Sequence, residues 1–341
     1  MPKRINNIFK ENITFTKLLE AHNKCKKNKR FKKQVIEFEM KLESNLIQIG
    51  KELLSGTYTF SKYFEFTIYE PKERKIKTLN YRDRVVQTWY VENFLKPYFK
   101  PNFINDSYAC IEEKGTHKAV EQTQKYLQKA DRKYIDVWIL KCDIKKFFFN
   151  IDRQILFNLL KRKIKDKYFL EFSKKIIFYN EEKVGIPIGN YTSQYYANIL
   201  MTKLDKYVKE NLKVCYYTRY MDDFVLILET KEKAKEMLEK IKTFLDENLK
   251  LELNSKTAYF KQNQGINFCG YRIWKTHRLL REQSKKKMKR KLKNFQKLYK
   301  KGKIELPYIT ACINSWKGHA KHANSYNLIN KMLEDFVLKK Q

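Results

Sequence analysis

Three aspartates stand where their side chains could take part in metal-assisted chemistry. Asp143 directly follows the apolar segment 136–142, Asp-Val-Trp-Ile-Leu-Lys-Cys, which predicts a short strand. Asp222 and Asp223 lie in the turn of segment 216–229, whose apolar arms predict a tight hairpin. Two adjacent carboxylates repel each other, and a divalent cation would relieve that repulsion. The alternative is a turn that takes Asp for its backbone geometry alone.

The position of Asp143 favours the metal interpretation. It precedes the aspartate pair by about 80 residues, and it can meet that pair if the strand and the hairpin are sheet neighbours. Three carboxylates around two metals about 3.5–4 Å apart are the arrangement of in-line phosphoryl transfer. One metal would lower the pKa of a primer 3′-hydroxyl, and the other would hold a triphosphate. We expect two Mg²⁺ ions, with Mn²⁺ as a possible substitute.

The charge of the chain points to a polyanionic partner. Among 341 residues, 73 Lys and Arg exceed 38 Asp and Glu, so the formal net charge is +35. Such an excess opposes compaction unless a polyanion neutralises it. Nucleic acid is the expected partner, with binding that weakens steeply as salt rises. An anionic membrane surface is the rival, but no apolar run approaches the roughly 20 residues that span a bilayer.

The cysteines and the N-terminus bear on the compartment. Six cysteines are far apart and form no CxxC, which argues against a zinc site and a disulfide scaffold. The first residues, Met-Pro-Lys-Arg-Ile-Asn-Asn, have no apolar segment behind them and do not read as a signal peptide. We therefore expect reduced thiols and a cytoplasmic location.

The elements that must position the aspartates follow from hydrophobic periodicity. Apolar residues at three- and four-residue steps predict helices over 31–55, 85–99 and 231–248, the first ending at Gly56. Alternating aromatic and β-branched residues predict strands within 58–80, with a turn at Glu70-Pro71-Lys72-Glu73.

A basic helix is expected near the C-terminus, over 285–303. Its single apolar stripe consists of Met288, Leu292, Phe295 and Tyr299. The remaining surface is mostly Lys, which either contacts phosphate or is a solvated face. The overall charge favours phosphate contact.

Seven short motifs, taken in order, resemble the sequence boxes of reverse transcriptases. Tyr220-Met221-Asp222-Asp223 resembles the catalytic box, and Lys-Cys-Asp-Ile-Lys-Lys-Phe-Phe at 141–148 resembles the box that supplies the first aspartate. The others are 187–194 (substrate binding), 254–257 (triphosphate lysine), 268–272 (primer grip), and 81–87 and 107–110 with 115–117 (fingers). The similarity covers about 55–275.

The resemblance implies an α+β right-hand polymerase with fingers, a palm built on an antiparallel sheet, and a helical thumb. The expected fingers span 1–135 with part of 145–190. The expected palm spans 136–275 and carries the catalytic hairpin, and the expected basic thumb spans 276–341.

The same resemblance assigns roles to single residues. Asp143 and Asp222 would bind both metals, Asp223 would assist, and the backbone carbonyl of Ile144 would add a ligand. The residues expected to bind the incoming dNTP are Lys72, Arg74, Phe148, Gly189, Gln194 and Lys256. The residues expected to contact primer and template are Tyr220, Met221, Gly270, Tyr271, Lys285, Lys289 and Lys293.

Three of the dNTP residues have specific expected functions. Phe148 would pack under the sugar and exclude a 2′-hydroxyl, unless it is a core aromatic of its Phe-Phe-Phe run. Gly189 would let the backbone approach the nucleotide, because it lacks a Cβ. Lys256 would protonate pyrophosphate, unless it is an ordinary surface lysine.

The substrate box departs from the usual Gln-Gly and Ser-Pro pattern. Ile188-Gly189 and Ser193-Gln194 resemble the reverse transcriptases of diversity-generating retroelements, as does the thumb segment 315–326. That family, bacterial or phage-encoded, copies a template-repeat RNA into error-prone cDNA by mutagenic retrohoming, with misincorporation opposite adenine. It works with a small basic accessory protein that forms an oligomer. Ile188 lacks the amide of Gln, so weaker discrimination between bases is expected.

Other functions remain open from the sequence. A group II intron protein would usually carry a maturase extension after its thumb. We expect residues 276–341 to form the thumb alone. A retron enzyme would show Val-Thr-Gly near its thumb, and this sequence lacks that motif. A phage-defence reverse transcriptase is harder to distinguish from the retroelement enzymes by sequence. The alternative from another class is an inactive RNA-binding protein on a polymerase scaffold.

Overall fold

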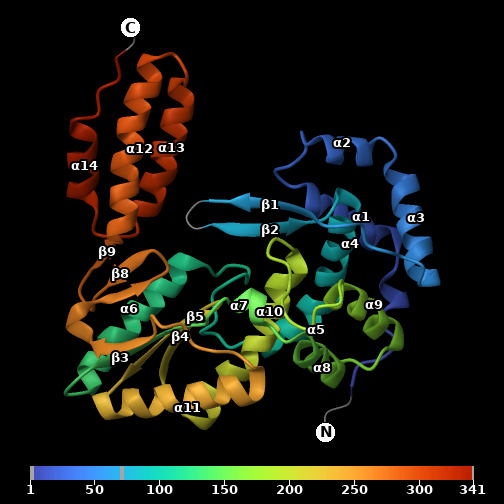
Figure 1. Cartoon of the computed structure of the whole chain (residues 1–341), viewed down its shortest axis with the longest axis horizontal. Coiled ribbons are helices and arrows are strands. Elements are labelled where there is room, and N and C mark those ends of the chain that lie inside the picture. The colour runs from blue at the N-terminus through green and yellow to red at the C-terminus, as the bar shows by residue number, and fades with distance from the viewer. Residues whose placement is uncertain (1–3, 70–72, 340–341) are drawn as a thin grey trace. The chain divides into compact units, whose positions relative to one another are not determined.

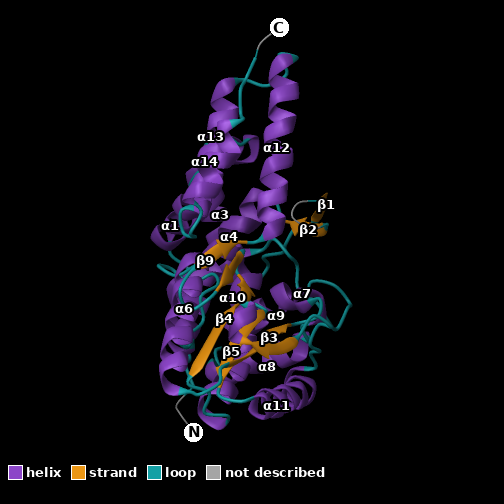
Figure 2. Cartoon of the chain, turned by 90° about the vertical axis from the view of Figure 1, so that its left-hand side faces the viewer, coloured by secondary structure: helices purple, strands orange, loops and turns teal. Residues whose placement is uncertain are grey.

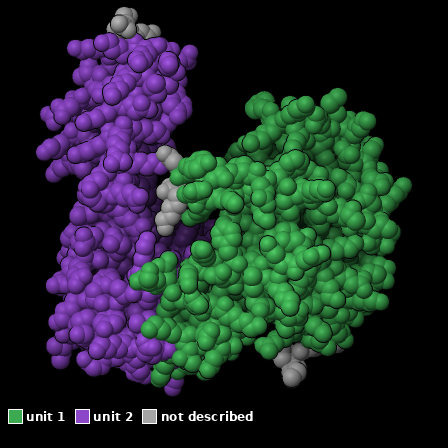
Figure 3. Space-filling view, viewed as in Figure 1, with its two compact units in different colours: residues 1–105, 144–211, 240–255 green, residues 106–143, 212–239, 256–341 purple. Residues whose placement is uncertain are grey.

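The computed structural model describes residues 4–69 and 73–339 and combines helices with strands (Figure 2). The chain forms two compact units, each built from three separate segments (Figure 3). Unit 1 contains Met1–Asn105, Ile144–Asn211 and Lys240–Ser255, and unit 2 contains Asp106–Asp143, Leu212–Glu239 and Lys256–Gln341. The division into fingers, palm and thumb stays a prediction. None of the described helices is long and apolar enough to cross a bilayer.

Unit 1 is mostly helical and carries one two-stranded antiparallel hairpin. Its larger elements are α1 (Phe15–Lys26), α2 (Lys33–Glu39), α3 (Leu42–Ser55), β1 (Phe64–Ile68), β2 (Arg74–Thr78), α4 (Tyr81–Tyr90), α5 (Lys96–Phe99), α7 (Phe147–Asn150), α8 (Arg153–Lys163), α9 (Lys167–Ile177) and α10 (Tyr191–Lys206). Its short elements are η1 (Lys10–Asn12), η2 (Val91–Leu95), η3 (Lys100–Asn102) and η4 (Tyr207–Asn211). The helix α11 (Lys231–Leu249), predicted over 231–248, begins in unit 2 and ends in unit 1.

Two helix predictions in unit 1 need correction. The single helix predicted over 31–55 is wrong, because α2 and α3 are separate helices with a break at Met40 and Lys41. Gly56 does end α3, in the left-handed conformation at φ +76°. The helix predicted from residue 85 starts earlier, at Tyr81, since the Asn80 side chain caps it.

The predicted strands of 58–80 are confirmed as β1 and β2, which pair antiparallel. The first three residues of the predicted turn, 70–72, lie outside the described residues. The strand β2 begins at Arg74, one of the residues predicted to bind dNTP.

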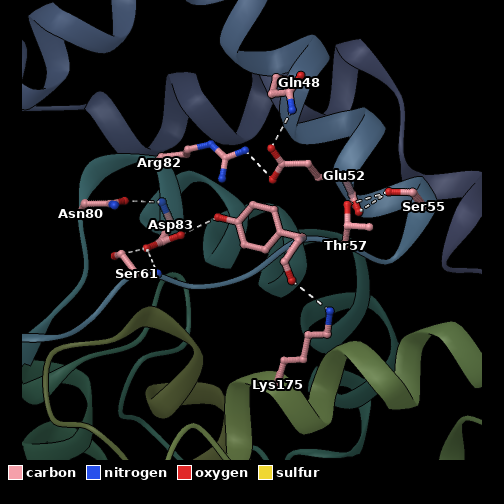
Figure 4. A network of polar contacts seen from close by, with 10 residues as sticks. Gln48, Glu52, Ser55, Thr57, Ser61, Asn80, Arg82, Asp83 and Lys175 are labelled. Carbon is pink, nitrogen blue, oxygen red and sulfur yellow. Dashed lines mark hydrogen bonds and ion pairs between the residues drawn. The ribbon is translucent and has the colours of Figure 1, made fainter.

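The finger box 81–87 is a structural anchor in unit 1 (Figure 4). Asp83 is buried and accepts from the Tyr58 hydroxyl at 2.6 Å and from the Ser61 backbone N–H at 2.9 Å. Its own N–H donates to Asn80 Oδ1 at 3.0 Å. A buried carboxylate needs such donors, so this box fixes the start of α4 against the chain before β1.

Unit 2 is built on a four-stranded antiparallel sheet in the order β4-β5-β3-β6. Its strands are β3 (Trp138–Asp143), β4 (Tyr216–Tyr220), β5 (Asp223–Leu228) and β6 (Ala258–Lys261). The predicted strand and the predicted hairpin are therefore confirmed as sheet neighbours. A second sheet has β7 (Ile266–Phe268), β8 (Tyr271–Ile273) and β9 (Arg278–Leu280), and η5 (Gln262–Gln264) precedes it.

Helices complete unit 2 around two apolar cores. One core joins both sheets to α6 (Thr116–Lys133). The other joins the three C-terminal helices, which are α12 (Glu282–Lys300), α13 (Leu306–Ala320) and α14 (Tyr326–Glu334) (Figure 1). The predicted stripe is confirmed, because Met288, Leu292 and Phe295 are buried there and Tyr299 packs against them.

Candidate active site

Strand register brings the predicted aspartates to one end of the unit 2 sheet. In the β3–β5 ladder Trp138 pairs with Leu228, and the antiparallel register ends with Asp143 directly opposite Asp223. Residues paired in this way have Cβ atoms roughly 4.5–5.5 Å apart. Asp222 is the adjacent residue in the β4–β5 turn. All three aspartates are only partly exposed.

The turn that presents Asp222 is conformationally unusual. Tyr220 pairs with Asp223, so Met221 and Asp222 form a two-residue hairpin loop. Met221 has φ +60° and is nearly buried. A positive φ at the first loop residue is normally a glycine position, and it costs a bulky side chain roughly 1–3 kcal/mol. The surrounding structure must therefore hold this turn in place.

Arg219 is the residue that holds it. Its side chain is fully buried, and its Nη1 donates to the Met221 carbonyl at 2.9 Å. Its backbone is fixed as well, because Arg219 N–H donates to the Asp106 carbonyl at 2.9 Å and Tyr108 N–H donates to the Arg219 carbonyl at 3.0 Å. Sequence reasoning missed Arg219. The sequence signal that could have indicated it was a single cation within a strand whose neighbouring residues are otherwise typical of a buried hairpin arm.

Lys141 is a second residue that sequence reasoning missed, although it stands in the quoted 141–148 box. Its ammonium forms an ion pair with Asp223 Oδ1, and its side chain is 15% exposed. Burial lowers the pKa of Lys141 to about 8, against the opposing effect of Asp143. The site is thus a place where negative charge already attracts a cation.

The chemistry of these residues fits a divalent ion. Carboxylate oxygens are the ligands magnesium prefers, and Asp223 Oδ1 is buried. Within residues 4–69 and 73–339, no group of three His, Cys, Asp or Glu side chains is placed to hold a metal ion. The three-aspartate ligand set therefore stays a prediction. The role of the Ile144 carbonyl also stays a prediction; Ile144 is buried and forms an isolated bridge with Leu253.

Three of the predicted dNTP residues lie on segments that unit 1 ties together. Lys77 N–H in β2 donates to the Ile188 carbonyl at 3.0 Å, and Ile186 N–H donates to the Phe148 carbonyl at 2.8 Å. The substrate box thus joins the strand of Arg74 to the helix of Phe148.

Gly189 has a second reason to be glycine. Its φ is +120°, and a Cβ built there would lie 2.9 Å from both the Lys77 carbonyl oxygen and Ile76 Cγ2. Only glycine fits this approach of the box to β2. The predicted approach to a nucleotide is untested, but close backbone packing is present.

The side chains predicted to bind dNTP differ in exposure. Phe148 is half-buried beside Phe147, with ring centroids 5.5 Å apart. Gln194 and Lys256 are exposed, the latter in the loop whose Thr257 hydroxyl accepts from Asp143 N–H at 3.4 Å. Lys72 lies outside the described residues.

The predicted primer grip is a tight hairpin turn in unit 2. Cys269 and Gly270 have φ +47° and +91°, the pattern of a two-residue I′ turn between β7 and β8. Tyr271 is buried, and its hydroxyl donates to the His319 carbonyl at 2.8 Å. A Cβ at Gly270 would meet His319 Cε1 at 3.4 Å. The turn is therefore packed against α13, and the Tyr271 side chain is committed to that contact.

The lysines of α12 stand on its polar surface. Lys289 and Lys293 are exposed. Lys285 is half-buried and pairs with Glu282 at 2.7 Å. Their contact with nucleic acid stays a prediction.

Comparisons with known proteins identify the family. The sequence profile described as reverse transcriptase (RNA-dependent DNA polymerase) matches residues 70–273. This is more than half of the chain, so the chain belongs to the reverse transcriptase family. The curated COX1/OXI3 intron 2 protein of Saccharomyces cerevisiae is 24% identical, over 67% of this chain and 34% of that protein. The group II intron-encoded protein LtrA of Lactococcus lactis is 23% identical, over 68% of this chain and 50% of that protein.

The chain thus spans half or less of the length of these curated relatives. Among solved structures, telomerase from Candida tropicalis, truncated from its C-terminal domain, matches with a TM-score of 0.51 at 15% identity. The match covers 65% of this chain and 55% of that chain. The predicted fold class, an α+β right-hand polymerase, is confirmed.

Proposed function

We propose that the protein is an RNA-directed DNA polymerase that extends a primer on an RNA template with dNTPs. The direct pairing of Asp143 with Asp223, beside Asp222 in the turn, carries this proposal. Membership in the reverse transcriptase family supports it. We place the enzyme in the cytoplasm.

The chain's own residues would act by holding charge and position. Asp143, Asp222 and Asp223 would bind two Mg²⁺ ions, or Mn²⁺ in their place. When bound, these ions would neutralise the negative charge of the phosphates. Arg219 would keep the Met221 turn in the shape that presents the two aspartates. Lys141 would balance the carboxylate charge between turnovers.

Unit 1 would supply the nucleotide contacts. Arg74 would meet the triphosphate, and Phe148 would pack under the sugar. The segment around Gly189 supports this assignment, because its backbone is hydrogen-bonded both to β2 and to the Phe148 carbonyl. The thumb lysines would contact the phosphates of primer and template.

For the subtype, we propose error-prone cDNA synthesis on the template-repeat RNA of a diversity-generating retroelement. The support is the Ile188-Gly189 and Ser193-Gln194 form of the substrate box and the thumb segment 315–326. A small basic accessory protein oligomer is the proposed partner.

A second candidate is a group II intron-type reverse transcriptase. The similarity to the group II intron-encoded protein LtrA and to the yeast intron protein favours it. These two candidates differ in fidelity, so the cDNA itself separates them.

The test is primer extension on a defined RNA with Mg²⁺ and dNTPs, followed by sequencing of the cDNA, with and without candidate accessory protein. Errors concentrated opposite template adenines would support the retroelement subtype, and Ile188→Gln should then reduce them. Faithful cDNA would favour the group II intron type, or a phage-defence enzyme. Absence of cDNA under all conditions would favour an inactive RNA-binding protein.

A further inference from the structure

Unit 1 contains a cavity that none of the predicted catalytic or substrate residues lines. Its volume is about 280 Å³, and it opens between α8, α10 and the chain after α5. The helices α8 and α10 lie against each other in unit 1 (Figure 1). This volume is near the lower end of the range for small-molecule sites, so it suits one small ligand.

The floor of the cavity is apolar. Phe99 and Ile199 are 4% and 5% exposed, and Leu159 and Phe103 complete the floor. The rings of Phe99 and Phe103 are flat and can accept the face of a nucleobase, and stacking of that type is tolerant of base identity.

The rim is cationic. Arg162, Lys203 and Lys206 line it, and no acidic side chain lines the cavity with them. All of the lining residues belong to the part of the chain that the structure describes. Lys163 also lines the cavity and donates to Asn102 Oδ1 at 3.3 Å. Three cationic side chains therefore line the same cavity as the apolar floor, and no carboxylate lines it with them.

The electrostatics indicate repulsion between two of these cations, Arg162 and Lys203. Burial, and then the neighbouring Arg162, lower the pKa of Lys203. Cations that repel each other are stabilised by a phosphate, which accepts charge-assisted hydrogen bonds from several donors. Lysines scattered over a convex surface, common in a chain of net charge +35, lack both the concavity and the floor.

We propose that this cavity is a nucleotide-binding site, with the phosphate on Arg162, Lys203 and Lys206 and the base on the Phe99–Ile199 floor. The nucleotide comes either free from solution or as one residue of a bound RNA strand. The proposal does not depend on polymerase activity, so it can fail or stand independently of the proposed function.

The test is lysine footprinting on the full chain. Brief acetylation is followed by mass spectrometry of Lys203 and Lys206, in the presence of AMP, adenosine, inorganic phosphate or a ten-nucleotide single-stranded RNA. We expect AMP to protect both lysines at a lower concentration than inorganic phosphate, and adenosine to protect neither. Lys161, which is exposed on α8 next to Arg162 and does not line the cavity, should stay unprotected by AMP.

A matched pair of variants sharpens the result. Arg162→Gln should raise the half-protecting AMP concentration roughly tenfold, because it removes a charge-assisted contact. Lys161→Gln makes the same change of charge one position away and should leave that concentration unaltered. Both positions are exposed, so neither change should unfold the chain.

The RNA arm identifies the source of the nucleotide. If RNA protects the two lysines at a lower concentration than AMP, and Arg162→Gln abolishes that protection, the nucleotide is part of a bound strand. If AMP protects them at the lower concentration, the nucleotide is free. The proposal is overturned if AMP protects no better than inorganic phosphate. It is also overturned if Arg162→Gln changes nothing, or if RNA protects Lys161 as well as Lys203.

Discussion

The aspartate end of the unit 2 sheet and the basic helix α12 hold their charged side chains in different ways. At the sheet end, Asp143 and Asp223 are fixed by strand register, and a buried Arg219 holds the turn between β4 and β5. On α12, only a narrow apolar stripe is buried, and the lysines stand on a polar surface.

The difference separates chemistry from affinity. A reaction centre depends on single atoms in fixed places, so one substitution there should abolish function. Attraction to a phosphate backbone is spread over many cations, so single substitutions on α12 should have small effects. The predictions below test this contrast, from the largest expected effect to the smallest.

Asp143→Asn should lower cDNA synthesis by more than roughly 100-fold, because it removes a carboxylate from the proposed metal site with little change of side-chain volume. RNA affinity should stay within about twofold, since the loss of one negative charge does not weaken phosphate contacts. Primer extension and filter binding measure the two quantities.

The matched control is Asp136→Asn, near the other end of the same strand. Asp136 is exposed and pairs with Lys261 at 3.1 Å, so its loss should leave synthesis unchanged. Equal loss of synthesis in both variants would show that strand integrity, and not the metal site, explains the effect.

Arg219→Lys should lower synthesis by roughly tenfold while keeping the charge, because lysine cannot reproduce the contact of Nη1 with the Met221 carbonyl. Met221→Gly in that background should restore part of the rate, since glycine adopts φ +60° without strain. Single-turnover rates measure both effects. Absence of any rescue would mean that Arg219 acts through another contact.

A triple change of Lys285, Lys289 and Lys293 to Gln should weaken RNA binding roughly tenfold and reduce the salt slope by about 2–3. Each single change should have a much smaller effect. The control is Lys118, Lys125 and Lys129 to Gln on α6, which removes the same charge from exposed positions. If the control variant reduces the salt slope of RNA binding as much as the α12 variant does, the α12 lysines are not a distinct contact surface.

Gly189→Ala should raise the KM for dNTP several-fold, because its Cβ would displace the substrate box from Lys77 and Ile76. Gly56→Ala provides the comparison: Gly56 also has positive φ, +76°, but nothing lies within 4 Å of a Cβ there. It should lower stability slightly and leave KM unchanged. A KM that moves equally in both variants would point to general backbone strain.

The smallest effect concerns the contact between α6 and the chain around α13. The rings of His117 and His322 stack with centroids 3.6 Å apart, and His319 lies 6.0 Å from His117. Burial, followed by the neighbouring imidazole His322, lowers the pKa of His117, and burial lowers that of His319. The other charged groups acting on His117 are Glu121, Arg278 and Lys321.

Because these pKa values are lowered, the folded state binds fewer protons than the unfolded state near pH 6.5. Stability is therefore retained above that pH and lost as the pH falls through it. The Tm should drop by roughly 2–4 °C between pH 7.5 and 5.5, and His117→Gln should reduce that drop. A pH-independent Tm would contradict this account of the histidine contact.

Much of this organisation could be predicted from the sequence. The apolar runs before Asp143 and around the hairpin predicted β3, β4 and β5, and buried strands leave little freedom in register. The stripe of α12 was equally readable, because Met288, Leu292 and Phe295 recur at helical spacing.

The features that could not be predicted depend on contacts between distant residues. A lone cation such as Arg219 reads as exposed, and its partner carbonyl becomes visible only when the turn is formed. Likewise, Gly189 meets Lys77 only through the fold. The break between α2 and α3 was missed because helical periodicity continues across Met40 and Lys41.

The most direct test of the central claim is primer extension by the unaltered chain on a defined RNA template, after chelation and again after adding Mg²⁺. We predict no cDNA after chelation, full-length cDNA on Mg²⁺ addition, and none in either condition for Asp222→Asn at unchanged RNA affinity. Synthesis that persists without divalent ions, or in Asp222→Asn, would contradict the assignment of this sheet end as the polymerase site.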